Sequence, residues 1–220
     1  MLLTQKILFP FLIVAFFLLF NFSNSFSQVT DKDGNTYKTV KIGKQEWMSE
    51  NLNVLHYRNG DEIPQVQDKD EWDNLTTGAW CYYENSTENG TTYGKIYNWY
   101  AVNDSRGLAP EGWHVPTDEE WTKLTDFLGG AENAGTKMKS TSGWDEDFAG
   151  NNSSGFNAIP GGYRTHDGYF GNKGRNAVFW STTEFNSERV WFRNVIGSIP
   201  DVYRPNYDKD FGLSVRCVKD

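Results

Sequence analysis

The clearest periodic pattern of hydrophobic positions lies in the middle of the chain. Trp121, Leu124, Phe127 and Leu128 recur at the three- and four-residue spacing of an α-helix, with mostly polar residues between them. The spacing predicts one amphipathic helix over residues 117–128. Its single apolar face must pack against another element, because an isolated helix of this length is not stable.

The sequence also marks both ends of this helix. Thr117 lies three residues before Glu120, so its hydroxyl can accept the Glu120 amide while the Glu120 carboxylate accepts the Thr117 amide. Gly129 follows the last apolar position and suits the left-handed backbone conformation that often ends a helix. We therefore expect a capping box at the start of the helix and a glycine stop at its end.

Elsewhere after residue 28, short runs rich in aromatic and β-branched residues are separated by Gly and Asn. In the last run Leu213, Val215 and Cys217 fall on one side of a strand, and Ser214 and Arg216 fall on the other. The runs predict strands at residues 36–40, 45–48, 79–83, 162–165, 177–182, 189–195, 202–204 and 212–218. A helix packed on such an antiparallel meander gives an α+β fold.

Three other stretches have weaker patterns. Residues 68–75 predict a short helical turn over Trp72 and Leu75. Residues 84–92 predict a polar loop, and residues 94–102 fit a strand or a short helix.

The first 27 residues have the pattern of a secretory signal peptide. Lys6 precedes an apolar run that is short for a membrane span, and small residues lead up to a cleavage point after Ser27. We expect export to the periplasm, the cell surface or the medium, with residues 28–220 forming one domain. The alternative is an uncleaved leader, which would be the chain's membrane contact. No Cys stands at the cleavage point, so we expect no lipid anchor.

Charge restricts the partners of the protein. The chain has 21 Lys and Arg against 29 Asp and Glu, which gives a formal net charge of −8. Loss of Lys6 with the leader makes the mature chain still more acidic. Such a surface repels nucleic acid and anionic lipid, so we expect neither as a partner.

The chain has two cysteines, Cys81 and Cys217. In an exported protein, two thiols most simply form one disulfide, which here would tie an early strand to the last one. Neither cysteine has a nearby His or a second Cys at metal-ligand or redox spacing. We therefore expect a structural disulfide between them.

Six segments together resemble one family. They are VKIGKQEWMSENLNV (40–54), YGKIYNWYAV (93–102), GLAPEGWHVPTDEEW (107–121), GFNAIPGGYR (155–164), FWSTTE (179–184) and FGLSVRCVKD (211–220). In this combination and order the chain resembles the Fibrobacter succinogenes major paralogous domain family. That family is similar to the C-type-lectin-like and formylglycine-generating-enzyme-like fold. The resemblance implies one main helix opened by VPTDEEW, long loops, and a last strand near the N-terminal strands. It brings no established activity with it.

Two activities of similar folds lack their residues here. Formylglycine-generating enzymes use a pair of cysteines near the last strand, whereas no second Cys lies between residues 82 and 216. C-type lectins hold sugar through calcium with a Glu-Pro-Asn or Gln-Pro-Asp loop, and neither tripeptide occurs in this chain. We therefore expect neither the oxidase chemistry nor that calcium-dependent mode of sugar binding.

One loop after the predicted helix carries oxygen donors of the kind that calcium prefers. They are Asp145, Asp147, Asn151 and Asn152. Their spacing does not match the twelve-residue calcium loop, which favours the alternative of a solvated loop held by hydrogen bonds from side chain to backbone. Calcium is the one cofactor for which the sequence offers candidate ligands.

Large aromatic side chains in or beside turns are the candidate ligand contacts, because the apolar face of a sugar stacks on a ring. They are Trp144, Tyr163, Tyr169, Phe170, Tyr203 and Tyr207. The alternative for each is packing in the core, since large aromatic residues are highly buried on average.

The sequence contains no nucleophile-elbow, zinc-protease or dinucleotide-binding motif. Our leading hypothesis is an exported, non-enzymatic binding or adhesion module that presents loops on a rigid scaffold to an extracellular glycan or protein. One alternative is an enzyme acting on polysaccharide, which a cleft with two facing acids would favour. Another is a structural subunit of a surface assembly, which a large apolar patch would favour.

Overall fold

The computed structural model describes residues 27–220. The predicted signal peptide therefore lies outside the described residues, apart from Ser27. The first strand begins at Gln28, the residue that follows the predicted cleavage point. Within the described part of the chain, no helix is long and apolar enough to cross a membrane.

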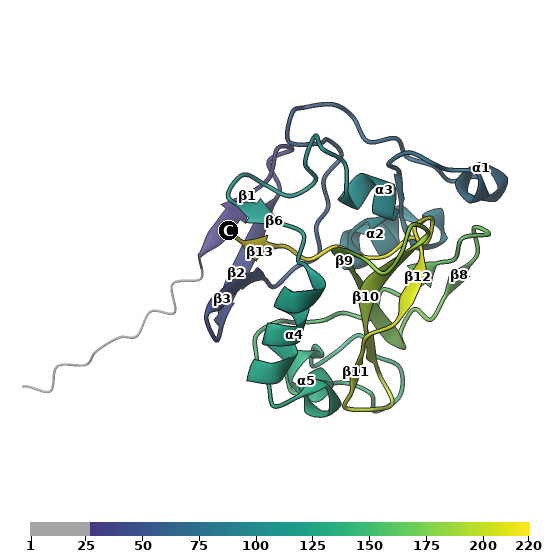
Figure 1. Ribbon diagram of the computed structural model, residues 1–220. Coiled ribbons are helices and arrows are strands. Elements are labelled where there is room, and N and C mark those ends of the chain that lie inside the picture. The colour runs from purple at the N-terminus through teal and green to yellow at the C-terminus, as the bar shows by residue number, and fades with distance from the viewer. Residues whose placement is uncertain (1–26) are drawn as a thin grey trace, which may run out of the picture.

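Both ends of the described chain meet in one five-stranded sheet (Figure 1). All its neighbouring strands run antiparallel, and the register aligns Trp47 with both Val40 and Val218. In order across the sheet, the strands are β1 (Gln28–Thr30), β2 (Thr36–Ile42), β3 (Gln45–Met48), β13 (Val218–Lys219) and β6 (Trp113–His114).

A second sheet of four strands is built on a long hairpin. Its strands are β9 (Asn176–Glu184), β10 (Arg189–Ile196), β11 (Val202–Tyr203) and β12 (Asn206–Asp208). β10 pairs antiparallel with the other three, and a bulge interrupts its pairing with β9 between Val190 and Phe192.

Two short ladders complete the strands. One joins β4 (Trp80–Cys81) to β5 (Ile96–Tyr97), and the other joins β7 (Tyr163–Arg164) to β8 (Phe170–Gly171). Most pairings are antiparallel and the helices are few, so the predicted α+β class is confirmed.

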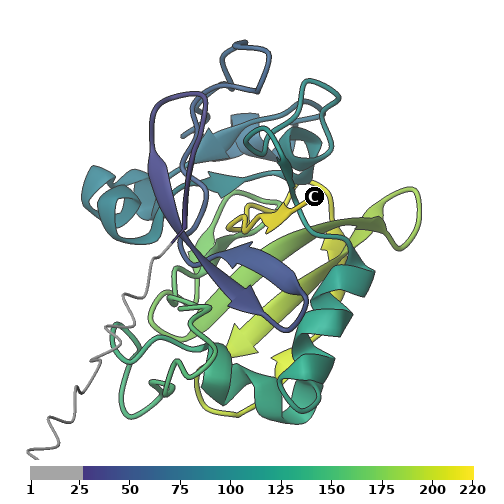
Figure 2. The same cartoon turned by 90° about the vertical axis from the view of Figure 1, so that its left-hand side faces the viewer.

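The helices are short. They are α1 (Lys69–Asp73), the 3-10 helix η1 (Tyr83–Asn85), α2 (Thr87–Tyr93), α3 (Trp99–Val102), α4 (Asp118–Phe127) and α5 (Ala131–Met138). α1 confirms the predicted helical turn and buries Trp72. Figure 2 shows α4 and α5 lying against the β9–β10 hairpin.

α4 is the predicted amphipathic helix. The Thr117 hydroxyl accepts the Glu120 amide at 3.2 Å, and the Glu120 carboxylate accepts the Thr117 amide at 2.8 Å, so the capping box is confirmed. Trp121 and Leu124 are buried. The prediction for Phe127 is wrong, because its side chain is 65% exposed. At 100° per residue, Phe127 points about 120° away from Trp121 around the helix.

The region from residue 84 to 102 is more regular than the sequence suggested. The prediction of a polar loop at residues 84–92 is wrong, because this stretch contains the end of η1 and most of α2. The Ser86 hydroxyl caps α2 by accepting a hydrogen bond from the Asn89 backbone amide. The stretch 94–102 contains both alternatives in succession, first β5 and then α3.

α5 is a helix that the hydrophobic pattern does not reveal. It buries small residues, Ala134 and Gly135, together with Met138. A Cβ atom added at Gly135 would lie 2.5 Å from the Pro200 carbonyl oxygen, so the helix packs directly against the backbone before β11. Because small residues make this contact, the helix lacks the wide apolar stripe that marks α4.

An aromatic cluster joins the two sheets to α4. Trp47 of β3 and Trp121 of α4 have ring centroids 4.8 Å apart, and Trp121 lies 5.6 Å from Phe179 of β9. Phe156, from the loop after α5, packs edge-on against all three rings at 5.7 to 5.8 Å. This cluster provides the partner that the apolar face of α4 requires.

The last segment runs between the sheets and is buried on both sides. The predicted alternation is confirmed, with Leu213, Val215 and Cys217 in the main core. The opposite side is not solvated, because Arg216 is fully buried, with its guanidinium 4.5 Å from the Phe156 ring. Only isolated bridges form at residues 212–214, so the strand is less continuous than predicted.

The predicted disulfide is wrong. Cys81 and Cys217 are both free thiols, and both are completely buried. Cys81 packs in a small cluster with Trp72 and Ile96, whereas Cys217 belongs to the main core beside β13. Burial raises the pKa of the Cys81 thiol to about 11 and raises that of Cys217 as well. Each sulfur therefore acts as a small apolar core group.

Candidate functional site

A small pocket opens between the β9–β10 hairpin, β12, the β7–β8 ladder and the last segment of the chain. Its volume is about 190 Å³. It is lined by Tyr163, Asn172, Asn176, Val178, Phe192, Asn194, Tyr207, Phe211 and Leu213. We call it the aromatic pocket.

One face of the β9–β10 hairpin supplies four of these side chains. Asn176 and Val178 are two residues apart on β9, and Phe192 and Asn194 are two residues apart on β10. Residues at this spacing share a face of a strand. The register then places Val178 opposite Asn194, which brings the apolar and amide groups together.

Aromatic rings form one wall of the pocket. Tyr207 stacks on Phe192 with centroids 5.0 Å apart and on Phe211 with centroids 4.7 Å apart. Tyr163 lies 6.3 Å from Phe211. Phe192 and Phe211 are buried, whereas Tyr207 is 46% exposed. Tyr207 is therefore held in place by two stacked rings, and the part of its side chain that they leave uncovered is exposed.

Asparagine amides form the rest of the polar lining. Asn176 Nδ2 donates to Asn194 Oδ1 at 3.0 Å, and Asn172 Nδ2 donates to Tyr163 Oη at 3.1 Å. Among the described residues, Asn194 Nδ2 and the Oδ1 atoms of Asn172 and Asn176 have no hydrogen-bond partner. The pocket thus offers a free donor and free acceptors, and no charged residue lines it.

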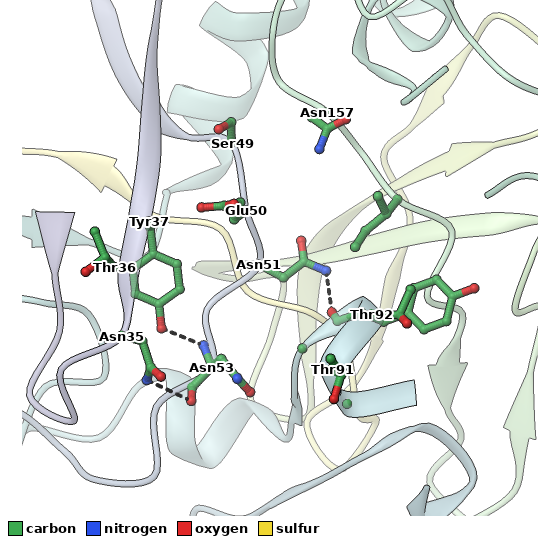
Figure 3. Close-up of a pocket in the computed structure, with 14 residues that line it drawn as sticks. Asn35, Thr36, Tyr37, Ser49, Glu50, Asn51, Asn53, Thr91, Thr92 and Asn157 are labelled. Carbon is green, nitrogen blue, oxygen red and sulfur yellow. Dashed lines mark hydrogen bonds between the residues drawn. The ribbon is translucent and has the colours of Figure 1, made fainter. Parts of the chain in front are cut away.

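A second cavity, of about 450 Å³, lies on another part of the molecule (Figure 3). Its walls come from the start of β2, the segment after β3, the end of α2 and residues 157–159. It is lined by Asn35, Thr36, Tyr37, Ser49, Glu50, Asn51, Asn53, Gly90, Thr91, Thr92, Tyr93, Gly94, Asn157 and Ile159. We call it the polar cleft.

Buried and part-buried hydrogen bonds hold the asparagines of the polar cleft. Asn51 donates to the Tyr93 carbonyl at 2.8 Å and accepts from Arg216 Nε at 2.9 Å. The Asn53 backbone N–H donates to Tyr37 Oη at 3.0 Å, and the side-chain Oδ1 of Asn53 accepts from Lys95 Nζ at 2.9 Å. Burial lowers the pKa of Lys95 to about 8. These bonds hold both asparagines in fixed orientations.

A comparison with protein families decides where the chain belongs. The model of the Fibrobacter succinogenes major domain (Fib_succ_major) matches residues 40–219, which is most of the chain. The chain belongs to the Fibrobacter succinogenes major domain family. No curated protein and no solved structure matches it.

In this Fibrobacter succinogenes major domain, two of the six predicted aromatic contacts come together, namely Tyr163 and Tyr207. Trp144 is buried and donates from Nε1 to Ser140, so the packing alternative holds for it. The others lie outside the pocket: Phe170 packs on Tyr83, Tyr169 lies near Lys69, and Tyr203 is on β11.

Seven of the residues that line the aromatic pocket were not predicted as ligand contacts. They are Asn172, Asn176, Val178, Phe192, Asn194, Phe211 and Leu213. A signal was present in and beside the predicted strands, because an asparagine and an apolar residue share one face of each hairpin strand, with Asn176 one residue before the predicted strand at 177–182. Amides on an otherwise apolar strand face need hydrogen-bond partners, which makes them candidates for a binding site.

Three of the four predicted calcium ligands make other contacts in the structure. Asn151 Oδ1 accepts the Ser153 amide at 3.0 Å, and Asn152 Oδ1 accepts the Asn157 amide at 2.8 Å. Asp145 pairs with Arg175 at 3.4 Å, and Asp147 is exposed. Over residues 27–220 no group of three or more His, Cys, Asp or Glu side chains is arranged to hold a metal ion. The loop is thus held by side chain to backbone hydrogen bonds.

One carboxyl group outside both cavities has a raised pKa. Burial raises the pKa of Asp210, and its Oδ1 atom has no hydrogen-bond partner among the described residues. Asp210 lines neither the aromatic pocket nor the polar cleft. Glu50 is the one acid that lines the polar cleft, and no acid lines the aromatic pocket, so neither cavity presents the two facing acids that a glycosidase requires.

Proposed function

We propose that this protein is an exported, non-enzymatic binding module whose aromatic pocket takes one sugar unit of a neutral extracellular glycan. The observation that carries the proposal is the combination of a partly exposed aromatic wall with free amide groups and no charge in one pocket. The apolar parts of a sugar pack against aromatic side chains, and its hydroxyls both donate and accept hydrogen bonds.

The size of the pocket supports a single sugar unit. Its volume of about 190 Å³ is below the range of roughly 300 to 1,000 Å³ that is typical of sites for drug-sized ligands. A protein ligand would need a much wider contact of about 800 Å² on each partner. The concave shape thus favours a glycan over a protein surface.

The chemistry of the lining supports binding without calcium. Amide and phenol groups are the polar groups of the aromatic pocket, and it contains no carboxylate. Calcium sites are usually built from several carboxylate oxygens. The phenol of Tyr163 is neutral at neutral pH and can form hydrogen bonds, and burial raises its pKa further.

We further propose that the fold is C-type-lectin-like. Two features support this assignment. β13 pairs with β3, next to the N-terminal strands, and one main helix follows directly on the VPT segment. Long loops on such a scaffold are where these folds carry recognition.

The test is affinity electrophoresis of the full chain in gels containing a neutral polysaccharide: β-glucan, xylan, galactomannan or pullulan. We expect retardation by at least one of them, unchanged by EDTA. Tyr207→Ala should weaken binding roughly tenfold, because it removes the most exposed side chain of the aromatic wall. Tyr203→Ala is the matched control, since Tyr203 is 49% exposed but lies outside the pocket.

Two results would contradict the proposal. The first is equal retardation of the Tyr207→Ala and Tyr203→Ala variants. The second is release of reducing ends from the polysaccharide during incubation, which would make the protein an enzyme.

A further inference from the structure

The polar cleft takes no part in the function proposed for the aromatic pocket. The two cavities share no lining residue, and they are built on different sheets. From its lining we infer that the polar cleft is a second, independent glycan-binding site that takes a neutral, hydroxyl-rich segment of polysaccharide.

The polar cleft contains hydrogen-bonding groups that are free to bind a ligand. Asn53 uses its Oδ1 to accept from Lys95, and Asn157 uses its Oδ1 to accept from Asn152, so both Nδ2 donors are left without a partner among the described residues. Glu50 accepts the Lys38 amide through Oε2 alone, which leaves Oε1 as a free acceptor.

Hydroxyl groups complete this set of donors and acceptors. Thr36 makes no side-chain hydrogen bond within the described part of the protein. Thr91 and Thr92 donate back to carbonyls of α2, which leaves their oxygens able to accept. In Figure 3 these side chains enter from separate stretches of the chain. Such mixed donors and acceptors match sugar hydroxyls, which act as both.

Hydrogen bonds within the protein hold the asparagines of the polar cleft in fixed orientations. Asn51 is 6% exposed and is bonded to Arg216, Ser214 and the Tyr93 carbonyl. Asn53 is held by Lys95 and Tyr37. Polar groups that are already oriented lose little conformational entropy when they bind a ligand.

The charge and the volume of the polar cleft favour a neutral ligand of more than one sugar unit. Glu50 is the one charged residue among those that line the cleft, and the chain is acidic, so anionic glycans are disfavoured. The volume of about 450 Å³ is more than twice that of the aromatic pocket, which gives room for more than one sugar ring. Tyr93, half-buried at the edge, offers a ring for stacking.

A bulky residue inside the cleft tests the inference. Thr91 and Thr87 are both exposed and lie one turn apart on α2, but only Thr91 lines the cleft. Thr91→Trp should therefore fill the cleft, while Thr87→Trp adds the same side chain outside it. Circular dichroism and thermal melting of both variants check that each one folds.

Binding is measured by affinity electrophoresis with the same four neutral polysaccharides. In a Tyr207→Ala background, we expect residual binding to at least one polysaccharide. Thr91→Trp should weaken that residual binding by roughly tenfold or more, and Thr87→Trp should leave it unchanged. Thr36→Val, which removes one hydroxyl with little change of shape, should weaken it by roughly threefold.

The outcomes separate this inference from the proposed function. If Thr91→Trp and Thr87→Trp bind equally well, or if Tyr207→Ala alone abolishes all binding, the second site is refuted and the aromatic pocket stands. If Tyr207→Ala has no effect but Thr91→Trp abolishes binding, the polar cleft is a site and the proposal for the aromatic pocket fails.

Discussion

Buried arginines stabilise the loops of this protein at the level of single residues. Arg164 and Arg216 are fully buried, and backbone carbonyls rather than carboxylates accept most of their hydrogen bonds. Arg193 instead pairs with Asp118 at the start of α4 at 2.6 Å. A planar guanidinium has five fixed donors, so one side chain can join several loop segments at once.

Arg216 is expected to contribute strongly to the stability of the fold. Burial lowers its pKa to about 9, so it remains charged at neutral pH, where it bonds Asn51 and the carbonyls of Met48 and Asn157. Arg216→Lys keeps the charge but loses the fork, and should lower the free energy of unfolding by about 3 kcal/mol in urea denaturation.

The control for Arg216 is Arg189→Lys. Arg189 is about half exposed and makes one ion pair with Asp208 at 3.3 Å. Its replacement should change the free energy of unfolding by less than about 0.5 kcal/mol. Equal effects of the two substitutions on the free energy of unfolding would show that the hydrogen bonds of Arg216 to Asn51 and the backbone carbonyls do not stabilise the fold.

At the level of elements, one small network ties the start of α4 to the five-stranded sheet. His114 of β6 lies between two carboxylates, with Nε2 2.9 Å from Glu120 and Nδ1 2.7 Å from Asp220. Glu120 also closes the capping box of α4 with Thr117. The helix start, β6 and the chain end therefore share one set of polar contacts.

The network predicts a pH-dependent contribution to stability. Burial alone would lower the pKa of His114, but Asp220 and Glu120 more than offset it and raise the pKa above the ordinary value of 6.5. The charged form is thus favoured in the folded state. The contribution of charged His114 to the free energy of unfolding is fully present below about pH 6.5 and is lost as the pH rises through the raised pKa of His114.

His114→Gln should therefore lower the free energy of unfolding more at about pH 5.5 than at about pH 8.5. The difference should stay below about 1 kcal/mol, because the His114 side chain is 37% exposed and solvent screens the pair. Urea denaturation at the two pH values measures it. His166→Gln is the control, since its one ion pair, with Asp73, is long at 3.7 Å and exposed. A difference that is larger at the higher pH would refute the assignment.

At the level of the whole molecule, packing and hydrogen bonds hold the described chain together without a disulfide. The aromatic cluster around Trp121 joins both sheets, and the last segment crosses between them. Cys81 and Cys217 lie in different core clusters. A chain of this size can bury enough apolar surface to fold without a covalent link.

Thiol titration tests this arrangement directly. The folded protein should not react with a thiol reagent such as DTNB, because both sulfurs are completely buried and their pKa values are raised. In urea without reductant, two thiols per chain should react. The required material is protein produced from the full chain with the predicted leader and collected after export. If no thiol reacts after unfolding, the two cysteines form a disulfide.

The sequence by itself determined the local elements of this protein and its family. The α4 helix with its capping box, the strands β2, β3, β9 and β10, and the alternation before β13 all follow from neighbours within about ten residues. Such patterns are readable because backbone hydrogen bonding and side-chain spacing within one element are local. The two tyrosines of the aromatic pocket were also found in this way.

Only the tertiary structure decided which of these elements meet. Trp47 is aligned with Val218, and Asn51 is bonded to Arg216, across most of the chain length. Those long-range contacts bury Arg216, keep the two cysteines in separate clusters and bring asparagines and rings into one pocket. Binding sites and core polar groups depend on contacts between distant segments, which no local pattern of hydrophobic and polar residues encodes.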